Sequence, residues 1–153
     1  MGSAFCGESA EHNYSRITNP SVRYFEERIE TITGVLGVTT LSTGMASITN
    51  TFLTIAQAGC NIVTSSHLFG NTYSLLNSTL RAFGVEPRFC DLTSMEAVRS
   101  QIDKNTCAIY LEVITNPQLE VADLRKPSAL AREAGVPLIA ATTIVPTHAF
   151  RAK

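Results

Sequence analysis

Five short apolar segments recur along this chain of 153 residues, and each gap between them is long enough to hold a helix. Such spacing is typical of alternating strands and helices, and it predicts a parallel sheet with crossover helices. We expect strands at residues 36–41, 61–65, 86–91, 107–113 and 137–142. Several of these segments are almost continuously apolar, as strands are when helices cover both faces of a sheet.

The intervening segments have helical patterns, and we expect helices at residues 45–58, 72–83, 94–102 and 123–134. Gly59, Gly84 and Gly135 stand where three of these helices should end, and glycine is the residue that most often terminates a helix. The predicted fold class is therefore α/β, with a mostly parallel sheet and flanking helices.

A further helix is expected before the first strand. Asn19 can cap it, Pro20 suits its first turn, and Gly34 marks its end. Residues 1–18 are polar and lack a regular pattern, which indicates an extended arm. We therefore divide the chain into an arm with one helix (residues 1–36) and an α/β domain (residues 37–153).

Polar segments follow the predicted strands at 42–45, 65–69, 112–117 and 141–143, and Asp91 follows another. The carboxyl ends of parallel strands meet at one edge of the sheet, where α/β proteins bind ligands. The turn Ser42-Thr43-Gly44-Met45 could present backbone N–H groups to an anion at a helix N-terminus. A hydroxyl from Tyr14 and a guanidinium from Arg16 could bind the same phosphate.

Composition excludes several classes of function. The net charge is −1 and charged residues make up 16% of the chain, so no basic surface is expected for nucleic acid. Polar residues interrupt every long uncharged stretch, so no membrane span is expected. Residues 1–10 contain Glu8 and no apolar block, which argues against a secretory signal and favours a cytoplasmic protein.

The four cysteines are far apart and include no C-x-x-C pair, so neither a zinc site nor a redox dithiol is predicted. We interpret Cys60, Cys90 and Cys107 as small buried apolar residues beside strands. His12, His67 and His148 are scattered, and none is tied locally to a thiol. No metal site is expected.

Five motifs occur in a characteristic order: Tyr14-Ser-Arg-x-x-Asn-Pro, Ser42-Thr-Gly-Met, Ser66-His-Leu-Phe-Gly-x-Thr-Tyr73, Glu112-x-x-x-Asn116-Pro117 and Pro137-Leu-Ile-x-x-x-Thr143. In this order the chain resembles the Cys/Met-metabolism family of pyridoxal-phosphate enzymes, which includes cystathionine gamma-synthase, methionine gamma-lyase and O-acetylhomoserine sulfhydrylase. The resemblance corresponds to the front part of the family and implies the incomplete large domain of a fold-type-I enzyme. It also implies pyridoxal 5'-phosphate as cofactor and a small amino acid as substrate.

The resemblance implies a role for each rim residue. Ser42, Gly44 and Met45 would hold the cofactor phosphate within their own subunit. Tyr14 and Arg16 would reach the phosphate of a neighbouring subunit, so the chain would form a homo-oligomer.

Around the ring, the resemblance places Phe69 on the pyridine face, where the family usually has Tyr. Asn116 would lie near the phenolic oxygen, Thr143 would complete the rim, and Glu112 would support it. Phe69 can stack as Tyr does, but it lacks the hydroxyl for proton transfer.

Two departures from the family pattern bear on catalysis. Ala141 stands where the family usually has an Asp that pairs with the ring nitrogen. The family's Schiff-base lysine lies beyond Lys153, and the environments predicted for Lys104, Lys126 and Lys153 do not suit that role. We therefore expect a truncated and inactive chain whose first strand lacks its neighbours, or one that rearranges or self-associates.

Three functions stay open at this point. The first is that of the family, gamma-replacement or gamma-elimination on homoserine esters, cystathionine or methionine. The second is a non-catalytic remnant that binds phosphate and associates through its arm. The third is a generic nucleotide-binding domain, which the absence of G-x-G-x-x-G and G-x-x-x-x-G-K-[ST] argues against.

Overall fold

The computed structural model describes residues 14–145, which fall into two compact units. Residues 14–40 belong to the first unit and residues 41–145 to the second, and each is considered separately below. Residues 1–13 of the predicted arm, including His12, lie outside the described part of the chain. So do His148 and Lys153.

The first unit is built on helix α2 (Pro20–Thr33), which confirms the helix predicted there. The Asn19 side chain accepts hydrogen bonds from the backbone N–H groups of Ser21 (3.0 Å) and Val22 (3.3 Å) and so caps the first turn. At the other end Gly34 has a φ of 72°, the left-handed conformation that glycine adopts without steric cost.

The strand predicted at residues 36–41 is wrong, because this segment is irregular. Its backbone donors are satisfied by α2 instead of a neighbouring strand. The N–H of Val38 donates to the carboxylate of Glu30 (3.2 Å), and the N–H of Thr40 donates to that of Glu26 (2.8 Å). Since no strand forms here, the expectation of a first strand without neighbours is wrong as well.

The second unit holds the four remaining strands in one parallel sheet, which confirms the predicted fold class. They are β1 (Asn61–Ser65), β2 (Glu86–Cys90), β3 (Thr106–Glu112) and β4 (Leu138–Ala141), in the spatial order β2-β1-β3-β4. Because β2 lies on one side of β1 and β3 on the other, the order reverses between β1 and β3. Sheets of this kind bind ligands at that point, beyond the carboxyl ends of the strands.

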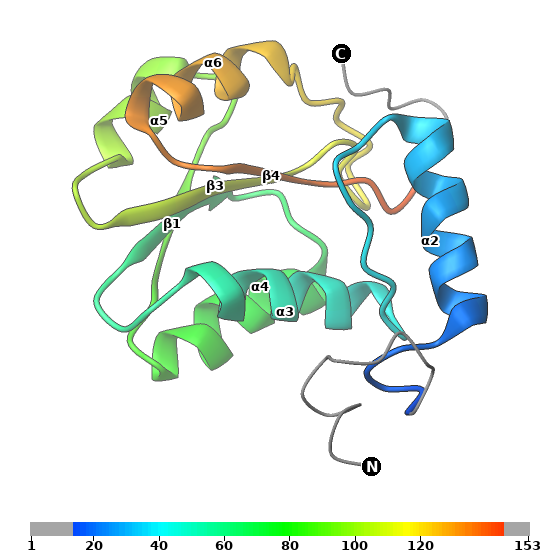
Figure 1. Ribbon diagram of the computed structural model, residues 1–153. Helices are drawn as coiled ribbons and strands as arrows, with labels where there is room; N and C mark the ends of the chain where they lie inside the picture. Colours follow the sequence, from blue (N-terminus) through cyan, green and yellow to red (C-terminus); the bar gives the residue numbers. More distant parts are fainter. Residues whose placement is uncertain (1–13, 146–153) are drawn as a thin grey trace. The chain divides into compact units, whose positions relative to one another are not determined.

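Helices cover both faces of this sheet (Figure 1). On one face lie α3 (Gly44–Ile55) and α4 (Gly70–Ser74), and the chain continues from α4 into a π-helical segment, η1 (Leu75–Leu80). On the other face lie α5 (Met95–Gln101) and α6 (Arg125–Ala134). The predicted helix at residues 72–83 thus begins two residues earlier than expected and changes its hydrogen-bond pattern midway.

Two apolar clusters fill the spaces between sheet and helices. Phe52 of α3 meets Tyr110 of β3 in one cluster, with ring centroids 5.1 Å apart and an edge-to-face geometry. Val63 and Ile109 point to the opposite face and pack with Val98 of α5. Alternate residues of one strand therefore enter different clusters, which explains why the strands read as nearly continuous apolar runs.

Adjacent residues of α3 provide a test of this packing. Phe52 is fully buried whereas Leu53 is 60% exposed. We expect Phe52→Ala to lower the free energy of unfolding by about 3–5 kcal/mol, since it leaves a cavity against Tyr110. Leu53→Ala should change it by less than about 0.5 kcal/mol. Urea denaturation followed by circular dichroism measures both, and equal losses would contradict the assigned orientation of α3.

Candidate functional site

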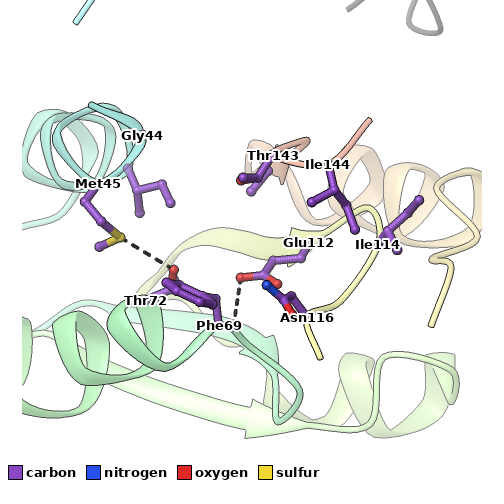
Figure 2. A pocket seen from close by; sticks show the side chains of 11 residues that line it. Gly44, Met45, Phe69, Thr72, Glu112, Ile114, Asn116, Thr143 and Ile144 are labelled. Carbon is purple, nitrogen blue, oxygen red and sulfur yellow. Dashed lines mark hydrogen bonds between the residues drawn. The ribbon is translucent and has the colours of Figure 1, made fainter. Parts of the chain in front are cut away.

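A cavity of about 270 Å³ opens at the carboxyl edge of the sheet, where the chain leaves β1, β3 and β4 (Figure 2). Five of the residues predicted to bind a cofactor contribute to its lining, so segments far apart in the sequence meet as expected. The eleven lining residues are Gly44, Met45, Ile48, Phe69, Thr72, Glu112, Ile114, Asn116, Ala141, Thr143 and Ile144.

One wall is the first turn of α3. The Thr43 side chain caps this helix by accepting a hydrogen bond from the N–H of Ala46 (3.0 Å). The N–H groups of Gly44 and Met45 have no acceptor within the helix, as is general for a first turn. Both residues line the cavity, so this wall offers backbone donors and the positive end of a helix dipole to an anion.

A second wall carries the aromatic ring of Phe69, which follows β1 and is 44% exposed. Helix α4 begins at the next residue, and its buried Thr72 donates a hydrogen bond to the sulfur of Met45 (3.9 Å). This contact connects α4 to the first turn of α3. The ring of Phe69 is therefore presented from a packed part of the structure.

Glu112, at the end of β3, joins two loops of the cavity. Its carboxylate accepts the backbone N–H of Phe69 (3.0 Å) and also a backbone hydrogen bond from Asn116. The side chain is buried, and this burial raises its pKa, while the two N–H groups act in the opposite direction. Glu112 thus sets the positions of Phe69 and Asn116 relative to each other.

The loop that carries Asn116 is itself tightly hydrogen-bonded. The backbone of Thr115 exchanges N–H and C=O bonds with Glu120 and Leu119, and its hydroxyl accepts the N–H of Glu120 (3.0 Å). A short antiparallel bridge between Ile114 and Val121 closes the loop. Asn116 therefore projects from a constrained turn.

Three predicted residues do not line the cavity. Tyr14 and Arg16 belong to the first unit, where the guanidinium carbon of Arg16 lies 5.3 Å from the centre of the Tyr14 ring. Their role toward a neighbouring subunit stays a prediction. Ser42 belongs to the same unit as the cavity and is exposed two residues before α3.

Sequence reasoning missed four lining residues: Ile48, Thr72, Ile114 and Ile144. Ile48 follows Gly44 by one helical turn, so the helical period could have placed it on the same face. Thr72 follows Phe69 by three residues, but its predicted place in a helix gave no reason to assign it to the rim.

Ala141 lines the cavity at the end of β4, and so adds a methyl group there and no charge.

The described lysines lie elsewhere. Lys104 borders a cavity at the amino edge of the sheet, opposite the candidate site, as predicted. Lys126 lies in a separate groove beside His67, whose Nδ1 is 2.7 Å from Glu120 Oε2. His67 is exposed and lies in the segment that follows β1.

Among residues 14–145 no group of three or more potential ligands is arranged to hold a metal ion. Within the same range no helix has the length and apolar character needed to traverse a bilayer.

Known proteins are similar to this chain in sequence. The chain is 40% identical over 131 residues to sulfhydrylase FUB7 of Fusarium oxysporum f. sp. lycopersici, which covers 86% of this chain and 30% of that protein. It is 37% identical over 131 residues to an L-methionine gamma-lyase of Fusobacterium nucleatum, with 85% and 33% covered. A homocysteine synthase of Schizosaccharomyces pombe is 37% identical over 130 residues, with 85% and 30% covered.

Solved structures agree with the fold. An O-acetylhomoserine sulfhydrylase from Wolinella succinogenes superposes with a TM-score of 0.82 at 45% identity, covering 85% of this chain and 37% of that one. A putative O-acetylhomoserine (thiol)-lyase from Campylobacter jejuni gives a TM-score of 0.88 at 28% identity, with 95% and 36% covered. The latter structure contains N'-pyridoxyl-lysine-5'-monophosphate.

The chain spans about a third of the length of these relatives. Their family model, described as Cys/Met metabolism PLP-dependent enzyme, matches residues 1–152. Since the match extends over almost the whole chain, this protein belongs to the Cys/Met-metabolism family of pyridoxal-phosphate-dependent enzymes.

Proposed function

We propose that this chain forms the phosphate- and ring-binding part of a pyridoxal-phosphate enzyme that acts on sulfur-containing amino acids or activated homoserine. The observation that carries the proposal is the meeting, in one cavity, of the α3 N-terminus, the Phe69 ring and Asn116. Family membership makes pyridoxal phosphate the cofactor to test against these residues.

The lining fits most of this cofactor. Backbone N–H groups of Gly44 and Met45 suit a phosphate, since they lie at the positive end of a helix. The Phe69 ring offers an apolar face for a pyridine, and the Asn116 amide offers a donor to a ring oxygen. When bound, pyridoxal phosphate supplies an electron sink for carbanions of amino acids.

The ring nitrogen of the cofactor has no charged partner at Ala141, the lining residue at the end of β4. Ala141 cannot pair with a protonated ring nitrogen, so the pocket binds the cofactor through the phosphate, through stacking on the ring and through the Asn116 amide. None of the eleven lining residues is a lysine, so an amine that anchors the cofactor must come from outside them. We propose that the described cavity binds the cofactor and leaves the proton transfers to other residues.

The remaining roles are proposals of the same kind. The reaction class is gamma-replacement or gamma-elimination on homoserine esters, cystathionine or methionine. Tyr14 and Arg16 are proposed to reach the phosphate of a second copy of the chain in a cytoplasmic homo-oligomer. Membership in a family with lyase and synthase members supports this range of reactions.

Ligand binding to the full chain tests the proposal. Titration with pyridoxal phosphate, pyridoxal and inorganic phosphate, followed by absorbance and equilibrium dialysis, should show saturable binding of the phosphorylated aldehyde, competition by phosphate and weaker binding of pyridoxal. Borohydride reduction before mass spectrometry should label no single lysine in this chain. Equal affinity for pyridoxal and its phosphate would contradict the phosphate site.

Gly44 allows a sharp test of the helix N-terminus. It is the first residue of α3, and Thr43 before it is extended, so proline should be accepted there while its N–H is lost. We expect Gly44→Pro to weaken pyridoxal phosphate binding about tenfold or more, as for the loss of one charge-assisted hydrogen bond.

Gly44→Ala is the matched control, because it keeps the N–H and its Cβ would meet no atom within 4 Å. It should bind pyridoxal phosphate more tightly than Gly44→Pro. Pyridoxal binding should differ little between the two variants. If both variants lose the same affinity for both ligands, the assigned phosphate contact is wrong.

The pKa of Glu112 leads to a pH test of its positioning role. Because burial raises this pKa in the folded chain, the folded state binds the proton more tightly than the unfolded state does. The stabilisation due to Glu112 is therefore greatest at low pH and is lost as the pH rises through the folded-state pKa. We expect the stability of the wild type relative to Glu112→Gln to increase as the pH falls from about 8 to about 5.

Urea denaturation at several pH values measures this difference. Glu96→Gln, at an exposed position in α5, controls for the removal of one negative charge. If the free energy of unfolding of the wild type relative to Glu112→Gln decreased as the pH falls, the raised pKa of the buried Glu112 would be contradicted.

A further inference from the structure

Two cysteines that are 47 positions apart in the chain meet in the structure. Cys60 directly precedes β1 and Cys107 lies in β3, and their sulfur atoms are 3.1 Å apart. Both are free thiols. The sequence interpretation of three isolated apolar cysteines missed this pair, because neither C-x-x-C spacing nor a local motif connects its members.

An irregularity in the sheet brings the two side chains to the same face. β1 pairs Asn61 with Thr106 and then Ile62 with Ala108, so Cys107 is an extra residue in β3. In a regular strand Cys107 would point to the same face as Ile109, which packs toward α5 and α6. Instead Cys107 packs against the cluster that contains Cys60, on the opposite face.

The backbone around Cys60 is held in place. Its N–H donates to the carbonyl of Gln57 (3.0 Å), and its carbonyl accepts the N–H of Glu86 (2.9 Å). Cys107 lies in β3 between Thr106 and Ala108, both of which pair with β1. Two thiols held so close together need little ordering before a bond forms between them.

A cavity of about 400 Å³ gives small molecules access to the pair. It lies at the amino edge of the sheet, opposite the candidate cofactor site, and its lining includes Cys60, Cys107 and Lys104. Burial raises the pKa of the Cys107 thiol to about 12, with a further contribution from Cys60. At neutral pH Cys107 is therefore held as a thiol.

We propose that Cys60 and Cys107 form a redox modification site, at which a hydroperoxide converts the two thiols into an intramolecular disulfide. One sulfur attacks an oxygen of hydrogen peroxide, the O–O bond breaks, and the thiol proton leaves with the other oxygen as water, so that this cysteine becomes a sulfenic acid. The second sulfur then displaces the sulfenic oxygen as another water, so hydrogen peroxide is reduced to two waters while two thiols are oxidised to one disulfide. An added dithiol reverses the change by exchange.

Peptide mapping of the full chain tests this assignment. The reduced protein is treated with hydrogen peroxide, remaining thiols are alkylated, and the peptides are analysed by mass spectrometry before and after dithiol reduction. We expect the loss of two of the four thiols and a dominant peptide linking Cys60 to Cys107. Cys90→Ser should give the same result, whereas Cys107→Ser should form no intramolecular link at Cys60.

The denatured chain provides the reference. In urea, Cys107 should pair preferentially with Cys90, which is closer in sequence, because shorter loops close more readily.

Binding of phenylarsine oxide gives a second readout that does not depend on variants. This arsenical needs two adjacent thiols, so it should bind to the reduced native chain at Cys60 and Cys107. A native chain that links Cys107 mainly to Cys90, or that binds no arsenical at this pair, would overturn the proposal.

Discussion

Parallel pairing of β1 with β3 is the constraint on which the rest of this structure depends. It brings the loop after β1, with Phe69, next to the loop after β3, with Asn116, although these residues are far apart in sequence. The carboxylate of Glu112 then joins the two loops through backbone hydrogen bonds. The same pairing, at its other end, places Cys60 beside Cys107. The candidate cofactor cavity and the cysteine pair therefore both depend on the pairing of β1 with β3.

Most of the rim could be predicted from sequence because it depends on the direction of the strands. Phe69, Asn116 and Thr143 follow β1, β3 and β4, and a parallel sheet with right-handed crossovers brings them to one edge. Gly44 begins α3 and follows no strand. The failed strand at residues 36–41 shows the limit of pattern reading. An apolar segment forms a strand only where another strand accepts its backbone bonds, and here α2 carboxylates accept them. The cysteine pair depends on a single extra residue in β3, which no periodicity reveals.

Ala141 leaves the end of β4 without a charged group in the cavity. The site has backbone donors for an anion and an aromatic face for a ring, but the end of β4 contributes only a methyl group. In the function proposed above, phosphate binding depends on main-chain N–H groups, which tolerate many side-chain changes, whereas pairing with a ring nitrogen would need a carboxylate side chain. Binding and activation of a cofactor can therefore diverge in a chain like this one, since different residues supply them.

The order of the sheet also determines where the chain opens most easily. β1 and β3 each bond to a strand on both sides, while β2 and β4 each have one strand neighbour within the described sheet. An amide of β1 or β3 can exchange its hydrogen with solvent only after two ladders and two helical layers separate. The slowest-exchanging amides should then lie directly behind Phe69 and Glu112. The floor of the cavity would then be the last region of the described sheet to open.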